Sequence, residues 1–159
     1  MAWYDLTTRF HLDVVPAAVF TAMVDPRGFL AHWRRVGGVE RLVAGDADGV
    51  GATYRGSVRA ALPYTLTWDM TTVRTEPPDL IEWEARGDLE GHGLWRMRPA
   101  EGGTDVRFRW QVRTTPTWMN LLAPVAHPAL RWSHDRAMRD GARALADHLG
   151  GSLSGFQTG

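Results

Sequence analysis

The stretch TDVRFRWQVRT, residues 104–114, alternates between apolar and polar side chains over its whole length. Successive side chains of a β-strand point to opposite faces of the sheet, so this alternation predicts a strand with one buried face and one solvated face. The buried face is expected to hold Val106, Phe108, Trp110 and Val112. Strands of this two-sided kind are typical of antiparallel sheets.

The residues before this strand have patterns that predict further strands of the same sheet. Six further segments have the composition and spacing of strands, and the connections between most of them are short and rich in Gly, Asp and Pro. Consecutive strands joined by connections this short are antiparallel. The six segments are residues 3–14, 38–45, 50–61, 64–75, 80–87 and 92–100.

Helices are predicted in two places. Between the first and second strands one helix begins at Pro16, and a second short helix over residues 26–36 ends at Gly37 and Gly38. After the last strand, residues 116–149 predict one long helix whose first half is interrupted by two prolines. This order indicates an α+β protein in which an antiparallel sheet has a helix covering one face.

Residues 1–149 are predicted to form a single domain, because 159 residues are enough for one well-buried core. The Gly- and Ser-rich residues 150–159 are expected to be a flexible tail outside that domain. The N-terminus lacks the pattern of a signal peptide, and no apolar run approaches the roughly 18 residues that cross a bilayer. A cytoplasmic protein without integral membrane association is therefore expected.

The composition excludes several kinds of chemistry. All 18 basic residues are arginine and cysteine is absent, which excludes lysine Schiff bases, thiol catalysis and thiolate metal sites. The 18 acidic residues bring the net charge to zero, so no overall field draws the chain to nucleic acid or to an anionic membrane. His127 and His134 lie about 10.5 Å apart along a helix, too far to share one metal ion. No metal and no other cofactor is predicted.

Half of the eight tryptophans fall on one face of the predicted sheet when each strand is divided by its alternation. The opposite face carries Glu82 and Glu84 with arginines on the next two strands, which indicates ion pairs on a solvated surface. The aromatic face is expected to hold Trp68, Trp83, Trp95 and Trp110, together with Tyr54, Met70, Met97 and Phe108.

The last helix directs smaller and more polar side chains toward these aromatics. On a helical wheel Leu130, His134, Met138 and Leu145 share one side, and small residues lie between them. Large side chains that face small and polar ones leave a cavity more easily than a filled core, although a sheet packed by aromatics is the alternative. His134 is then either a polar group facing that cavity or a core histidine hydrogen-bonded to a neighbouring group.

Three stretches resemble a known family. Residues 16–33, PAAVFTAMVDPRGFLAHW, resemble the opening of proteins of the SRPBCC superfamily, also called the Bet v 1-like or START-like helix-grip fold. Residues 68–95 and 118–138 resemble its polyketide cyclase/dehydrase branch. The resemblance covers residues 1–149. It implies a curved antiparallel sheet of about seven strands wrapped around a long C-terminal helix, with an apolar ligand cavity between them.

The resemblance also implies candidate catalytic residues. In aromatase/cyclases of the family, an arginine on a central strand and hydroxyl-bearing residues in the pocket orient the polyketide and assist dehydration. Arg74 lies an even number of residues after Trp68 and Met70 in the same strand, so it is expected to point inward with them, at the end of the strand. Tyr54 is the best inward hydroxyl, and His134 supplies a ring that can hydrogen-bond or protonate a ligand oxygen.

Two functions are consistent with these residues. The first is a polyketide cyclase/dehydratase-like lyase without a metal or redox cofactor, in which Tyr54, His134 and Arg74 handle protons and carbonyls. The second is a non-catalytic carrier or sensor of a lipid or an aromatic metabolite. A third, an interaction module of the co-chaperone kind, requires a large exposed apolar patch, and the charged outer face of the sheet argues against it.

Under either of the first two functions the partner is a bulky hydrophobic small molecule, aromatic or polycyclic in character, and not nucleic acid. The sequence does not indicate the oligomeric state. The residues expected to contact the ligand are Trp68, Met70, Trp83, Trp95, Met97, Phe108, Trp110 and Met138.

Overall fold

A computed structural model describes residues 3–34, 36–59 and 64–159. Within these residues, eight strands form one antiparallel sheet in the order β2-β3-β4-β5-β6-β7-β1-β8. The elements in chain order are β1 (Trp3–Leu12), α1 (Pro16–Val24), α2 (Arg27–Leu30), β2 (Val36–Val43), β3 (Thr53–Arg59), β4 (Thr65–Glu76), β5 (Leu80–Gly87), β6 (Leu89–Ala100), β7 (Gly103–Thr114), α3 (Thr117–Leu149) and β8 (Leu153–Thr158).

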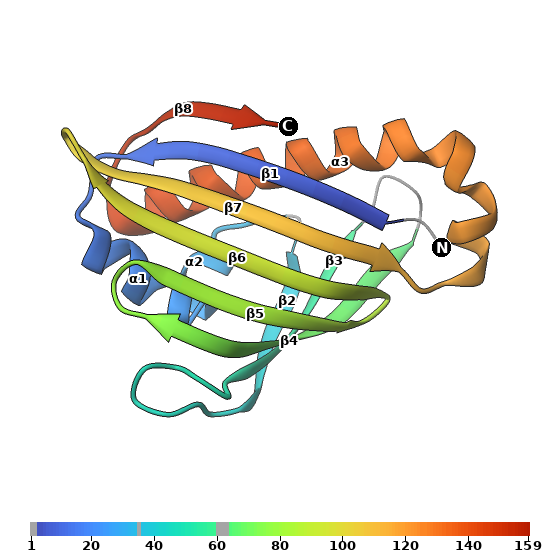
Figure 1. Ribbon diagram of the computed structural model, residues 1–159, viewed down its shortest axis with the longest axis horizontal. Helices are drawn as coiled ribbons and strands as arrows, with labels where there is room; N and C mark the ends of the chain where they lie inside the picture. Colours follow the sequence, from blue (N-terminus) through green and yellow to red (C-terminus); the bar gives the residue numbers. More distant parts are fainter. Residues whose placement is uncertain (1–2, 35, 60–63) are drawn as a thin grey trace.

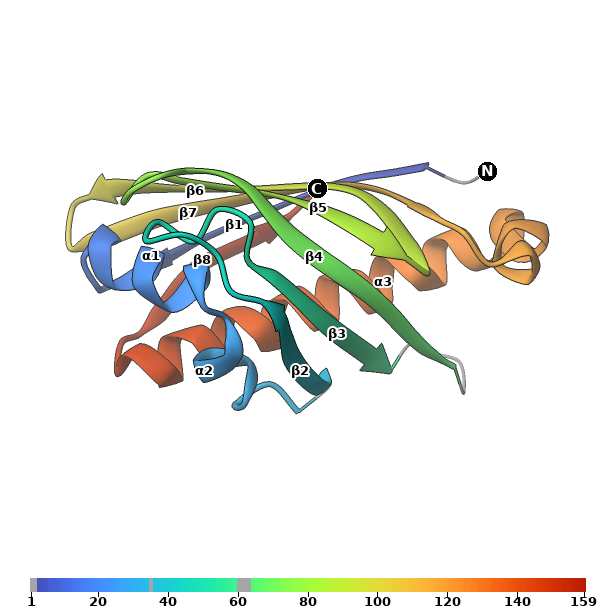
Figure 2. The ribbon, with the colours of Figure 1, turned by 90° about the horizontal axis from the view of Figure 1, so that it is seen from below.

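The sheet curves around the long helix. Figure 2 shows the strands arching over α3, with α1 and α2 placed at one end of the arch, and Figure 1 shows α3 running along the sheet. In β7 every second residue from Thr104 to Thr114 is buried, as the alternation predicts. The predicted α+β helix-grip architecture is confirmed.

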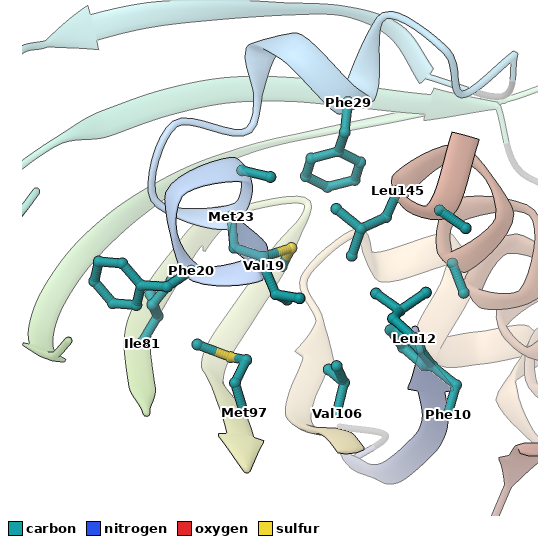
Figure 3. Close-up of a cluster of buried hydrophobic side chains, with 13 residues drawn as sticks. Phe10, Leu12, Val19, Phe20, Met23, Phe29, Ile81, Met97, Val106 and Leu145 are labelled. Carbon is teal, nitrogen blue, oxygen red and sulfur yellow. The ribbon is translucent and has the colours of Figure 1, made fainter. Parts of the chain in front are cut away.

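A core of apolar side chains closes the end of the arch that carries α1 (Figure 3). Pro16 stands in the first turn of α1, where the missing N–H has no intrahelical partner to lose. The helix then directs Val19 and Met23 toward Met97 of β6, and Leu145 of α3 meets the same cluster. Val19 and Met97 are completely buried. The space around Val19 and Met97 is therefore filled.

The last ten residues differ from the expected flexible tail, because Leu153–Thr158 form strand β8 on the free edge of β1. The amide of Thr7 donates to the carbonyl of Gly159 at 2.8 Å, and the amide of Gly159 donates back at 2.9 Å. Leu153 and Phe156 also pack against the core. An open strand edge offers unpaired backbone groups, and pairing overrides the weak strand propensity of a Gly-rich segment.

The helices differ from expectation in continuity and length. Helix α3 runs unbroken through Pro124 and Pro128, whose rings lie on its exposed side, so that the carbonyls they leave without an N–H partner can be solvated. It ends at Gly150, which adopts a left-handed conformation with φ 67°. Helix α2 covers only four residues of the expected 26–36, because turns follow it. Residues 60 and 61 of the expected strand 50–61 lie outside the described residues.

Candidate functional site

A cavity of about 250 Å³ lies between the concave face of the sheet and α3. Strands β1 to β7 and all three helices contribute to its wall, which is mostly apolar. Gly141 of α3 also borders the cavity, and a Cβ there would stand 3.1 Å from the indole of Trp33. The glycine lets that indole lie directly on the helix.

Nine of the predicted site residues line this cavity. They come from β3, β4, β5, β6, β7 and α3, which are brought together only by the curvature of the sheet. The nine are Tyr54, Trp68, Met70, Trp83, Trp95, Phe108, Trp110, His134 and Met138.

Met97 does not line the cavity. It shares the inner face of β6 with Trp95, but it lies further along the strand, where α1 covers the sheet and fills the space. Its side chain is completely buried in the core. The prediction that Met97 contacts a ligand is not supported by this position.

Arg74 points away from the cavity, so the expected inward orientation is wrong. The pairing of β4 with β5 shifts between Thr72 and Arg74, and this bulge inserts one residue that reverses the alternation beyond it. Arg74 lies on the outer face, where its Nη1 stands 3.5 Å from a carboxylate oxygen of Glu82. Glu84 pairs with Arg86 at 3.7 Å. Both glutamates therefore form surface ion pairs, but their arginines lie on β4 and on β5 itself and not, as predicted, on the two strands that follow.

Four buried polar atoms on the cavity wall have no hydrogen-bond partner within the described residues. Most buried polar groups in folded proteins are hydrogen-bonded, and each one left without a partner costs roughly 1–3 kcal/mol. A concentration of such atoms around one cavity indicates a place for a polar ligand. The atoms are Tyr4 Oη, Trp33 Nε1, Trp68 Nε1 and His134 Nε2.

His134 faces the cavity from the middle of α3. Burial lowers the pKa of its ring to about 4, since a charged imidazolium would lose its hydration there. The neighbouring carboxylate of Asp135 opposes this shift, and the charge of Arg131 adds to it. The ring is therefore neutral at pH 7, and its unpartnered Nε2 decides between the two alternatives left open by the sequence in favour of a cavity-facing group.

The two cavity tyrosines are both held in their protonated form, because burial raises the pKa of each phenol. Tyr54 is paired across the β2–β3 ladder with Arg41, which hydrogen-bonds to its side chain. Tyr4 instead stacks its ring on His127 of α3, with 4.9 Å between the ring centroids, and its hydroxyl has no partner among the described residues. The Tyr4 hydroxyl is therefore available to donate a hydrogen bond to a ligand.

Sequence reasoning missed Tyr4 and Trp33. The stretch WYDLTTRFHL over β1 carries the needed signal for Tyr4, because its even-numbered positions are all buried. No comparable signal exists for Trp33, which lies in the turns between α2 and β2, where side chains follow no fixed period. Within the described part of the chain, no three histidines or carboxylates come together as a metal site requires.

Replacing Tyr4 by Phe is expected to stabilise the ligand-free protein. The change removes a buried hydroxyl without a partner and keeps the ring on His127, so the free energy of unfolding should rise by about 1 kcal/mol. A thermal melt should show a midpoint about 2–4 °C higher. Tyr64→Phe is the matched control, since the Tyr64 hydroxyl has an acceptor in Asp88. A Tyr4→Phe midpoint at or below that of the unmodified protein would contradict the assignment.

Known protein families include one that matches nearly the whole chain. A family model described as polyketide cyclase/dehydrase and lipid transport matches residues 4–150. Among proteins of curated function, none matches the sequence.

Solved structures share the fold at low sequence identity. TTHA0849 from Thermus thermophilus is 16% identical with a TM-score of 0.75, over 92% of this chain and 97% of that one. The ZhuI aromatase/cyclase from Streptomyces sp. R1128 is 15% identical with a TM-score of 0.76, over 94% of each chain. The di-domain ARO/CYC protein BexL is 16% identical with a TM-score of 0.71, over 92% of this chain and 50% of its own. The chain belongs to the polyketide cyclase/dehydrase and lipid transport family of the SRPBCC superfamily.

Proposed function

We propose that the cavity binds a bulky, largely apolar aromatic or polycyclic molecule that carries carbonyl oxygens, and that the protein acts on it as a polyketide cyclase/dehydratase-like enzyme. The observation that carries the proposal is the group of four unpartnered polar atoms on a mostly apolar wall. Apolar walls favour rings, and the polar atoms select where oxygens must lie. A volume of about 250 Å³ suits a molecule of a few rings.

The polar atoms restrict the chemistry of the ligand. An indole N–H can only donate a hydrogen bond, so Trp33 and Trp68 each require an acceptor. Tyr4, held protonated by its raised pKa, is a third donor. A molecule with several carbonyl or phenolic oxygens satisfies these donors, whereas a hydrocarbon chain leaves them unpaired. An aromatic ketone is thus favoured over a simple acyl chain.

His134 is the group that can accept a proton in this proposal. Its neutral Nε2 takes a proton from a carbon next to a carbonyl, and the resulting enolate carbon forms a bond to a second carbonyl carbon of the same molecule. The oxygen of that second carbonyl takes the proton back and becomes a hydroxyl. Loss of this hydroxyl together with a neighbouring hydrogen releases water. Tyr4 and Trp68 donate to the oxygens on which negative charge develops.

A non-catalytic carrier or sensor is the second candidate, and one observation favours it. A pKa of about 4 makes His134 a weak base, and a weak base removes protons from carbon slowly near pH 7. The same cavity and the same donors then only orient the ligand.

Binding is tested with flavone and flavan, two molecules of one skeleton of which only flavone carries a ring carbonyl. Quenching of tryptophan fluorescence should show flavone bound about tenfold more tightly, because its carbonyl accepts from a donor that is otherwise unpaired. Trp68→Phe should remove most of that preference while keeping an aromatic ring in place. Trp83→Phe is the matched control on the next strand and should keep it. Equal affinity for both molecules in the unmodified protein would contradict the proposal.

Catalysis is tested separately with benzoylacetone, a small aromatic diketone with an acidic carbon between two carbonyls. Nuclear magnetic resonance in deuterated water should show faster exchange of that carbon's hydrogens with the unmodified protein than with His134→Gln. If flavone binds but exchange is not accelerated, the carrier function is correct and the enzyme function is wrong. Mass spectrometry of molecules extracted from the purified protein would then name the cargo class.

A further inference from the structure

The first half of α3 exposes large apolar side chains. Leu121 and Val125 are 77% and 82% exposed, and Trp132 is 58% exposed. Figures 1 and 2 show these first turns of the helix at the end of the molecule remote from α1 and α2, projecting beyond the strands. We name this surface the α3 apolar face; it consists of Trp118, Leu121, Leu122, Val125 and Trp132.

These residues form one stripe along the helix. They recur at spacings that keep them on a single side of an α-helix, opposite to His134, which points into the cavity. A stripe from Trp118 to Trp132 is about 21 Å long. It is thus a continuous apolar surface and not a set of scattered exposed residues.

The turns of α3 that carry the stripe hold no negative charge. No acidic residue occurs from Thr115 to His134, and the only charged residue in that range is Arg131. The next turns on the same side of the helix carry the exposed Arg136, Arg139 and Arg143, together with Asp140 and Asp147. The guanidinium of Arg136 lies over the ring of Trp132, 5.5 Å from its centroid. An apolar stripe with tryptophan at both ends therefore has Arg131 within it and Arg136 directly beside it, and aspartates enter this side of the helix only from Asp140 onward.

We propose that the α3 apolar face docks on the surface of a bilayer that contains anionic phospholipid. A helix that lies in the interface buries its apolar side among the acyl chains, places tryptophan at the level of the headgroups and directs arginine to phosphate. Within the described residues, no helix is long and apolar enough to cross a membrane. The net charge of the chain is zero, so the attraction is local to this face and acts within about a Debye length.

Docking through the α3 apolar face brings the bilayer close to the cavity. Met119 and Leu130 belong to the same turns of α3 but point inward and line the cavity. An apolar ligand dissolved in the bilayer therefore lies within a helix diameter of its binding site. This last step rests on the proposed function, whereas docking itself does not.

Docking is tested by sedimentation with large unilamellar vesicles. Vesicles of phosphatidylcholine with about one third phosphatidylserine should pull down the protein, and phosphatidylcholine alone should do so much less. The double variant Leu121→Glu and Val125→Glu should lose about tenfold or more of the partition coefficient. The control is Leu42→Glu with Val43→Glu, which adds the same charges at two exposed apolar residues of β2 and should bind as the unmodified protein.

The arginines are tested on the same vesicles. Arg136→Gln and Arg143→Gln should each weaken binding about fivefold when phosphatidylserine is present and have little effect on phosphatidylcholine alone. Equal binding to both vesicles would overturn the assignment to anionic lipid. No binding to either kind of vesicle would overturn membrane docking. If analytical ultracentrifugation shows a dimer, and the double variant Leu121→Glu and Val125→Glu is a monomer, the α3 apolar face binds a second copy of the chain instead. Flavone affinity of the same variant in solution should be unchanged, which separates a failure here from a failure of the proposed function.

Discussion

Acidification from pH 7 to pH 4 is expected to destabilise the protein by about 3 kcal/mol through His134 alone. Burial holds the folded-state pKa of this ring at about 4, below the ordinary value of 6.5. The unfolded chain therefore binds a proton at a pH where the folded protein does not. The contribution of His134 to stability is complete above pH 6.5 and is lost as the pH falls toward 4.

Urea unfolding at a series of pH values measures how the free energy of unfolding falls with pH. His134→Leu should flatten the stability profile between about pH 6.5 and pH 4.5, whereas His92→Gln, which removes an exposed histidine, should leave it unchanged. Hydrogen bonds from Arg109 and Arg27 lower the pKa values of Asp5 and Asp25, so stability that depends on these carboxylates is lost only at lower pH. A profile of His134→Leu as steep as that of the unmodified protein would show that this ring is accessible to water.

Met97→Ala is expected to cost about 2–5 kcal/mol of unfolding free energy and to leave flavone affinity unchanged. The side chain is completely buried among α1 and the inner faces of β6 and β7 (Figure 3), so truncation leaves an empty space in a close-packed region. Met97 itself does not line the cavity, so its truncation removes no contact that a ligand there can make.

Met70→Ala is the matched comparison. Met70 shares the inner face of the sheet with Met97, but it lines the cavity and is only partly buried. Its truncation should cost clearly less stability and should weaken flavone binding. Urea unfolding and tryptophan fluorescence quenching on both variants measure the two effects. If Met97→Ala weakens flavone binding as much as Met70→Ala does, the core and the cavity are one continuous space.

The alternation in β7 and its neighbours was enough to predict the sheet and the face that collects the tryptophans. The alternation gave the wrong orientation for Arg74, because a β-bulge reverses the alternation before that residue. No residue type in the segment signals this bulge. The alternation also failed at Leu153–Thr158, because a strand that forms by completing the edge of β1 depends on a partner about 140 residues earlier in the chain. Local patterns describe a segment, and both errors concern pairing between segments.

Local sequence patterns are enough to predict an antiparallel sheet around a helix, with Trp68, Trp110 and His134 on the inner side. The period of a strand or helix assigns each side chain to a face, and that assignment needs no tertiary contact. What covers each part of the inner face depends on contacts between segments that are far apart in the chain. Near Met97 the covering element is α1 and the space is filled. Near Trp68 a cavity lies between the sheet and α3, and Tyr4 and Trp33, from distant segments, add polar atoms to its wall.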